Sequence, residues 1–268
     1  MGAIGIVAGA AALIWYVPIE YTLFPSNPPS LAVEPLNVAK SFPKGTRVTV
    51  VTAHPDDAEF YLGATLPEIR DAGADLSLVV VTDGDKGYYP FEDAEANRQV
   101  RRAEQTEAAH RWGAKDVQFL GFPDGRVHSG DDLNNAIRGA LERLHPEVIL
   151  SFDDLYPPRR HHADHARTAE SVAAILPSLK GVRAIGRFST EAPNRVFDAS
   201  RRWAEKLELM KVHKSQFDTK RTGFFDRLIG RGGDDPFAFI NNIVEGMARE
   251  DGARIKVPLG EGLRWSDL

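Results

Sequence analysis

The residues best suited to chemistry form one short turn, His54-Pro55-Asp56-Asp57. The apolar, β-branched run before it, residues 48–51, predicts a buried strand. Adjacent carboxylates repel each other unless a cation or a catalytic task holds them together. His54 and Asp57 are three residues apart and can converge on one metal ion. Asp56 would then be free to act as a general base beside a metal-bound water.

A structural role is the alternative for this turn. Aspartate is common where a strand leads into a helix, so Asp56 or Asp57 could cap the helix predicted to start near Ala58. A cap needs neither the second carboxylate nor His54. The full quartet therefore favours a metal site.

A second cluster, residues 159–165, contains His162 and His165 at the predicted start of a helix. Residues three apart at a helix start can point both rings at one place. With His54 and Asp57 they complete a three-ligand site and leave one histidine over. The chain has no cysteine, so any zinc must be held by histidine and carboxylate, as in catalytic rather than structural zinc sites.

The elements that must position these residues alternate between strand and helix. The pattern predicts strands over residues 48–53, 75–82, 116–122 and 147–152, with helices near 58–72, 92–112, 131–144 and 166–176. Such alternation is typical of a Rossmann-like α/β fold, a mostly parallel sheet with helices on both faces. Ligands bind such sheets at the carboxyl ends of the strands. Four residues follow directly after predicted strand ends: His54, Asp83, Asp124 and Asp153.

The later part of the chain is less regular. It predicts strands over residues 183–190 and 195–199, an amphipathic helix over 201–217 and a short helix near 240–249. The catalytic domain is therefore expected to cover residues 44–268.

Residues 1–24 begin with seventeen residues without a charged side chain, and the first charge is Glu20. This length is near the lower limit for crossing a bilayer, so we expect a probable transmembrane anchor and a single-pass membrane protein of unknown sidedness. A cleaved signal peptide, which would make the protein secreted or periplasmic, and an apolar helix docked on the domain are the alternatives. Residues 25–43 are rich in proline and predict an extended linker.

The chain has 268 residues, a formal net charge of −5 and a pI near 5.9. This length suits a single large domain with a small accessory segment. The acidic balance gives no electrostatic footprint for nucleic acid, so nucleic-acid binding is not expected. Oligomeric state cannot be inferred from these patterns.

Taken together, the motifs resemble the PIG-L/LmbE-like family of zinc-dependent N-acetylglucosaminyl deacetylases. The resemblance spans roughly residues 47–216 and rests on five blocks: Ala53 to Glu59, Arg101 to Gly113, Phe119 to Gly125, His162 to His165, and Lys206 with His213 to Gln216. The first and fourth blocks, in this order, are highly specific. Trp112 stands where the family usually has leucine, which we interpret as a packing variation.

The resemblance implies the role of each candidate residue. One Zn²⁺ per chain would be held by His54, Asp57 and His165. Asp56 would be the catalytic base and His162, in its protonated form, would face the developing oxyanion. Arg101 and Asp124 would contact the sugar or its attached group. Arg160 occupies a place where some relatives carry a tyrosine beside the substrate.

The expected function is hydrolysis of the N-acetyl group from an N-acetylglucosamine-type conjugate by zinc-activated water. The partner is then an N-acetylated amino-sugar conjugate, with the membrane contacted through the N-terminal segment. The alternatives are a membrane-tethered, non-catalytic sugar-binding module and another metal-dependent hydrolase. An intact base beside a complete ligand set argues against a pure binder, and two-metal phosphoesterase sites need more bridging carboxylates.

Overall fold

The computed structural model describes residues 28–86, 93–158, 162–217 and 236–268. Its centre is an eight-stranded sheet with the order β1-β7-β8-β6-β5-β2-β3-β4. The strands are β1 Glu34–Pro35, β2 Arg47–Thr52, β3 Asp75–Thr82, β4 Ala114–Phe122, β5 Val148–Phe152, β6 Ala184–Phe188, β7 Arg195–Asp198 and β8 Gly260–Asp267. The predicted α/β class with a mostly parallel sheet is confirmed.

Five neighbouring strands, β4, β3, β2, β5 and β6, run parallel to one another. The chain order reverses between β2 and β5, which is where an open α/β sheet forms its ligand crevice. His54 follows β2 and His162 follows β5. The topology therefore delivers both predicted histidine clusters to the same place.

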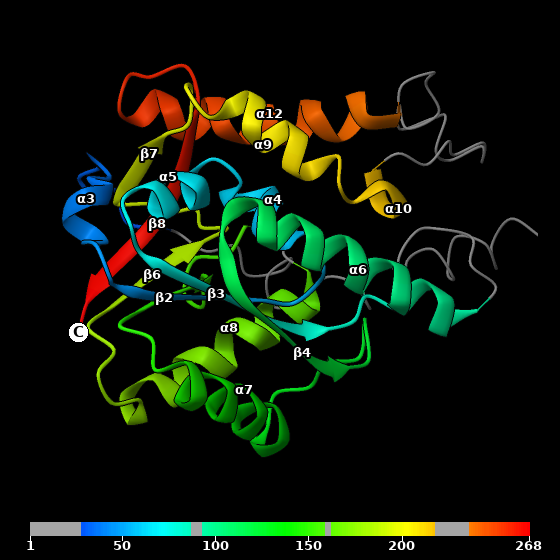
Figure 1. Ribbon diagram of the computed structural model, residues 1–268. Coiled ribbons are helices and arrows are strands. Elements are labelled where there is room, and N and C mark those ends of the chain that lie inside the picture. Colours follow the sequence, from blue (N-terminus) through cyan, green and yellow to red (C-terminus); the bar gives the residue numbers. More distant parts are fainter. Residues whose placement is uncertain (1–27, 87–92, 159–161, 218–235) are drawn as a thin grey trace, which may run out of the picture.

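Helices cover both faces of the sheet (Figure 1). On one face lie α7 Asp131–Leu144 and α8 Ala163–Ile175. The other face carries α4 Asp57–Leu62, α5 Thr65–Asp71, α6 Ala94–Trp112, α9 Trp203–Met210 and α12 Pro236–Arg254. The short helices are α3 Val38–Ser41, α10 Lys214–Phe217 and the 3₁₀ turn η1 Leu176–Ser178.

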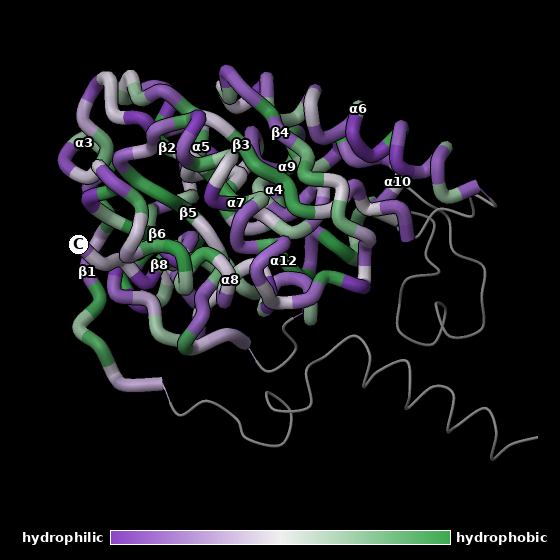
Figure 2. The backbone as a smooth tube through the Cα atoms, turned by 90° about the horizontal axis from the view of Figure 1, so that it is seen from below, coloured by the Kyte–Doolittle hydropathy of each residue, from purple (hydrophilic) through white to green (hydrophobic). Residues whose placement is uncertain are grey.

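The central strands are apolar on both sides, and Figure 2 shows their hydrophobic residues enclosed by more hydrophilic helices. Successive residues of β2 serve opposite faces: Val50 packs in the core beneath α4 and α5, while Val51 packs with Leu133 and Ile137 of α7. Because side chains alternate along a strand, one β-branched run supplies two cores.

The helix predicted over residues 58–72 is two helices. Helix α4 ends at Leu62 and α5 begins at Thr65. Pro67 lies in the first turn of α5, where its missing N–H leaves no hydrogen bond unmade. The break therefore falls before Pro67, not at it. The helix predicted over 201–217 is likewise divided into α9 and α10.

Strand β8 was not predicted. It runs antiparallel to β6 and β7 and joins them. Its sequence alternates only weakly between polar and apolar residues, so a period-two signal is faint. Within the stretch expected to be a linker, β1 pairs with β7 and α3 packs near α5.

The expected single-pass membrane localisation is corrected here. Among the described residues, no helix is both long and apolar enough to cross a membrane. The two longest of these, α6 and α12, have 19 residues each, and both contain several charged side chains, in α12 from Glu245 onward, which a bilayer core excludes. The predicted anchor itself, residues 1–24, lies outside the described residues.

Candidate metal and catalytic site

His54, Asp57 and His165 bring their ligand atoms together. Nδ1 of His54 lies 3.1 Å from Nε2 of His165 and 3.6 Å from Oδ2 of Asp57. Nε2 of His165 lies 3.0 Å from Oδ1 of Asp57. A tetrahedral Zn²⁺ with ligands at about 2.0–2.1 Å separates its donors by about 3.3 Å. The two imidazole nitrogens are close to this spacing, and Asp57 approaches them with different oxygens, Oδ2 toward His54 and Oδ1 toward His165.

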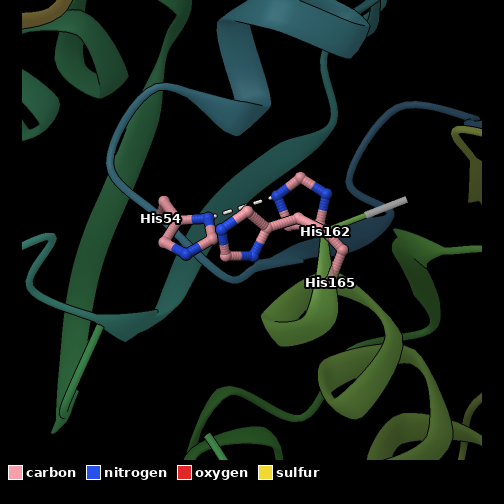
Figure 3. A group of neighbouring side chains, drawn as sticks. All are labelled: His54, His162 and His165. Atoms are coloured by element: carbon pink, nitrogen blue, oxygen red, sulfur yellow. Dashed lines mark hydrogen bonds between the residues drawn. The ribbon is translucent and has the colours of Figure 1, made fainter. Parts of the chain in front are cut away.

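His162 approaches the same point from the start of α8. The donor atoms of His54, His162 and His165 all lie within 4.8 Å of one another, and Figure 3 shows the three rings turned toward each other, with the His54–His165 contact dashed. The ring of Phe152 stacks on His165 at 4.1 Å between centroids. The rings are thus held by packing as well as by hydrogen bonds.

Two further carboxylates, those of Asp164 and Asp124, lie beside Nε2 of His54. Nε2 of His54 lies 3.1 Å from Oδ2 of Asp164 and 3.2 Å from Oδ1 of Asp124. These three residues also form a group that could hold a metal. However, Asp164 already accepts hydrogen bonds from the backbone N–H groups of Gly125 and Val127. Asp124 and Asp164 are therefore better suited to accept a hydrogen bond from Nε2–H of His54 than to bind a metal. With its proton on Nε2, His54 directs the lone pair of Nδ1 toward Asp57 and His165.

The charges of the cluster follow from this packing. Burial alone lowers the pKa of His54, but the carboxylates beside it, Asp124 foremost, raise it well above its ordinary value. Burial alone raises the pKa of Asp57, but the His165 and His54 rings hold it well below its usual range. The carboxylates thus favour a positive charge at His54, and a bound cation would take the place of that proton.

Asp56 is the candidate base and is held separately from the ligands. Its Oδ2 accepts a hydrogen bond from Arg101 at 3.1 Å, and its backbone N–H donates to Gln105 at 2.7 Å. Burial raises the pKa of Asp56 to about 6, with Arg101 opposing and Asp57 adding to the effect. A carboxyl group tuned toward neutrality suits proton transfer.

Neither aspartate of the turn acts as a side-chain cap. Asp56 occupies the N-cap position of α4 but makes no capping hydrogen bond. Asp57 accepts from the backbone N–H groups of Ala53 and His54, which precede the helix. The capping alternative therefore does not explain the two carboxylates.

The hydrogen bond to Nδ1 of His162 determines where its proton lies. Nδ1 accepts the backbone N–H of Asp164 at 3.2 Å, which leaves the proton of a neutral ring on Nε2. Burial, together with His54 and His165, lowers the pKa of His162 to about 3. A neutral His162 differs from the protonated form expected from the sequence, because burial and the neighbouring rings of His54 and His165 both disfavour a charge on it.

The predicted substrate-binding residues fall in different places. Arg101 and Asp124 line the same cavity of about 310 Å³ as Asp56 and the histidines. Both are nearly buried, and Arg101 also donates to the carbonyls of Pro55 and Gly84. Arg160 lies outside the described residues.

Sequence reasoning missed three supporting residues. Asp164 lies inside the second histidine motif but was given no role. Gln105 comes one helical turn after Arg101 on α6, and their i, i+4 spacing was a usable signal. Glu59 follows the first motif and is completely buried. It accepts hydrogen bonds from Trp112, Gln105 and His213.

Trp112 is more than the packing variation expected. Its ring is buried in the core, and its Nε1–H donates to Glu59 at 2.5 Å. Leucine could not make this bond, so the departure from the family pattern adds a polar contact beneath the site.

Comparison with known proteins agrees with this geometry. Residues 49–176 match the family model described as PIG-L: GlcNAc-PI de-N-acetylase. Over these residues the chain is similar to the PIG-L family. The matched PIG-L region contains every described candidate ligand and the candidate base.

Proteins similar to this chain carry deacetylase names. It is 29% identical to a probable N-acetyl-alpha-D-glucosaminyl L-malate deacetylase 2 of Bacillus anthracis, over 65% of this chain and 83% of that one. It is 27% identical to the diacetylchitobiose deacetylase of Thermococcus kodakarensis, over 69% and 73%. The solved N,N'-diacetylchitobiose deacetylase of Pyrococcus horikoshii, in complex with its inhibitor MPG, superposes with a TM-score of 0.72 at 25% identity, covering 87% of each chain.

Proposed function

We propose that this protein is a metal-dependent hydrolase that removes the N-acetyl group from an N-acetylglucosamine-type conjugate. The observation that supports this most is the approach of two imidazole nitrogens and a carboxylate to within 3.0–3.6 Å of one another, in a cavity that also contains Asp56. The match of residues 49–176 to the PIG-L family model and the names of the relatives support the choice of an amide as the bond broken.

His54, Asp57 and His165 are the proposed ligands, and Zn²⁺ is the proposed ion. A set of two nitrogens and one carboxylate oxygen matches catalytic zinc sites with an open position. When bound, Zn²⁺ supplies Lewis acidity, which makes water a nucleophile near neutral pH and polarises a carbonyl group.

Asp56 is proposed to accept the proton of the attacking water, and Asp56 or His162 then donates a proton to the leaving amine as the C–N bond breaks. Its hydrogen bond from Arg101 fixes the carboxylate in the cavity and leaves the other oxygen for the water. His162 is proposed to donate Nε2–H to the acetyl oxygen as negative charge develops there. One well-placed donor of this kind contributes about 3–4 kcal/mol to catalysis.

The amino sugar is proposed to contact Arg101, Asp124 and Arg160. Asp124 and Arg101 border the same cavity as Asp56, so a sugar whose acetyl group faces Asp56 has its hydroxyl groups within their reach. Arg160 remains a prediction from the sequence.

The test is an acetate-release assay on a panel of N-acetylglucosamine conjugates, run with metal-loaded protein and after chelation. We expect release to require the metal, to stop on chelation and to return when Zn²⁺ is added back. No release from any conjugate by protein shown to hold one metal ion per chain would contradict the proposal.

A further inference from the structure

A second cavity adjoins the candidate site. It has a volume of about 800 Å³ and shares Phe60, Tyr61 and Ile243 with the smaller cavity that contains Asp56 and the histidines. Cavities of 300–1,000 Å³ are the usual size of small-molecule sites. A molecule whose acetyl group reaches Asp56 can therefore extend past these three side chains into the larger space.

The walls of this cavity come mostly from outside the family match at residues 49–176. One face of α12 contributes Ile243, Met247, Asp251 and Arg254, spaced at helical intervals. The loop after β6, residues 189–191, and the start of β8, residues 260–262, close the other sides. The matched region carries the candidate ligands, so this surface is suited to distinguish one conjugate from another.

The apolar part of the wall suits a sugar ring. Phe60, Tyr61 and Phe188 line it, and Tyr61 stacks on Phe188 with 5.4 Å between ring centroids. Ile243 and Met247 also line it and are large hydrophobic side chains that remain 38% and 39% exposed. Sugars present C–H groups that pack against such surfaces, while their hydroxyl groups need acceptors.

The polar part of the wall is acidic. Among the described residues that line it, the carboxylates are Glu191, Glu250, Asp251 and Glu261, and the cations are Lys206 and Arg254. Lys206 is bound to Glu261 at 2.6 Å, and Arg254 lies 3.7 Å from both Glu250 and Asp251. These two cations therefore have three carboxylates as partners, which leaves the paired groups with an excess of negative charge. A concave surface with such an excess repels anionic ligands.

We propose that this space, here named the aglycone cavity, binds the group attached to the N-acetylglucosamine unit and selects an uncharged glycosyl group over an anionic one. The inference rests on the proposed function, since it assigns the remainder of the same substrate. Carboxylates accept the hydroxyl groups of the second sugar, and the aromatic wall packs against its ring. The cations that an acidic aglycone such as malate meets among the described lining residues, Lys206 and Arg254, already have acidic partners.

Binding and turnover test this separately. The Asp56→Asn variant, loaded with Zn²⁺, is titrated calorimetrically with N,N'-diacetylchitobiose and with N-acetylglucosaminyl malate. We expect the disaccharide to bind at least about tenfold more tightly. Equal or tighter binding of the malate conjugate would overturn the aglycone assignment. Because affinity is measured without hydrolysis, the titration tests the aglycone assignment even if no acetate release is found and the proposed function is rejected.

A pair of variants then locates the selectivity. Met247→Trp fills the aglycone cavity from an exposed position on α12, so folding should be preserved. We expect the ratio of kcat/KM for diacetylchitobiose to that for free N-acetylglucosamine to fall at least about tenfold. Asn242→Trp places the same ring on α12 at an exposed position that does not border the cavity, and its ratio should equal that of the parent protein. An unchanged ratio in Met247→Trp would show that the second sugar binds elsewhere.

Charge reversal provides a further check. The Glu250 side chain is 76% exposed, so Glu250→Lys should fold normally. It removes one carboxylate from the rim and adds a cation, and we expect the preference for the disaccharide over the malate conjugate to narrow by about threefold or more at low ionic strength. A preference that stays the same would contradict the electrostatic part of the proposal.

Discussion

Asp56 holds a backbone conformation that is uncommon for a residue with a side chain, with φ 126° and ψ −22°. Such conformations cost on the order of 1–3 kcal/mol and persist only where the surroundings impose them. Here the backbone N–H of Asp56 donates to Gln105, and Arg101 holds both the Asp56 carboxylate and the Pro55 carbonyl. Arg101 and Gln105 of α6 therefore fix the position of Asp56.

Two substitutions separate proton transfer from metal binding. Asp56→Asn keeps the three proposed ligands but removes the base, so it should retain one metal ion per chain and lose about 10²–10⁴-fold in kcat. His165→Ala removes a ligand and should lose the metal. Metal content measured by plasma mass spectrometry, beside acetate release, distinguishes the two. Retained metal with full activity in His165→Ala would remove that ligand assignment.

Gln105 is expected to act as a positioning residue. It is completely buried and bridges the Asp56 N–H to the Glu59 carboxylate. Gln105→Met preserves its length but releases both partners, so kcat should fall about 10- to 100-fold while metal content and KM change little. The matched control is Gln99→Met on an exposed position of the same helix, which should behave like the parent. A loss of metal in Gln105→Met would indicate a structural role instead.

At the scale of elements, the sequence predicts the central part of the fold well. Strands β2, β3 and β5 are long apolar runs that only a sheet covered on both faces can bury, and each ends where a polar residue begins. The strand-to-helix alternation then brings His54 and His162 together without any knowledge of side-chain geometry. The sequence could not show which nitrogen of His54 faces the ligands, since this depends on Asp124 in the loop after β4 and on Asp164 in the first turn of α8.

The later elements escaped prediction because their stability comes from partners distant in sequence. Strand β8 has a weak pattern of its own and is fixed by pairing with β6 and β7. Glu261 at its start accepts hydrogen bonds from the backbone of Ala64 and Thr65. The sequence around Glu261 does not indicate that its partners are Ala64 and Thr65, nearly two hundred residues earlier.

The Lys206–Glu261 pair is predicted to hold α4, α9 and β8 together. Both side chains are about 3% exposed, and Lys206 also donates to the Phe60 carbonyl. Lys206→Met leaves Glu261 buried without its counter-ion, which should lower the free energy of unfolding by about 3–5 kcal/mol. Lys211→Met, at a position that is 50% exposed on the same stretch of chain, should change it by about 0.5 kcal/mol or less. Urea denaturation measures both, and equal effects would contradict this role.

For the whole molecule, Asp251 is predicted to make stability depend on pH. Burial raises its pKa to about 6, although the Gly262 N–H and Arg254 oppose the shift. A carboxyl group with a raised pKa contributes its stability below its unfolded pKa of about 4 and loses it as pH rises through 6. The charged form thus destabilises the fold at neutral pH.

Asp251→Asn removes this titration while keeping an acceptor for Gly262. Since the Asp251 side chain is 25% exposed, solvent reduces the effect, and we expect the variant to be more stable than the parent by about 1 kcal/mol at pH 8. The difference should disappear at pH 4, where Asp251 is protonated. Thermal unfolding of both proteins across this range measures it, and a difference independent of pH would refute the assignment.

The position of β8 also sets an order for assembling the molecule. Strand β7 pairs with β1 and β8, and β8 alone links it to β6. During synthesis, β2 to β6 can form their parallel sheet before β8, residues 260–267, is available to pair with β7. If synthesis paused before Gly260, the histidines of the emerged chain could already lie close together. The chain would still lack residues 260–262, which line the aglycone cavity.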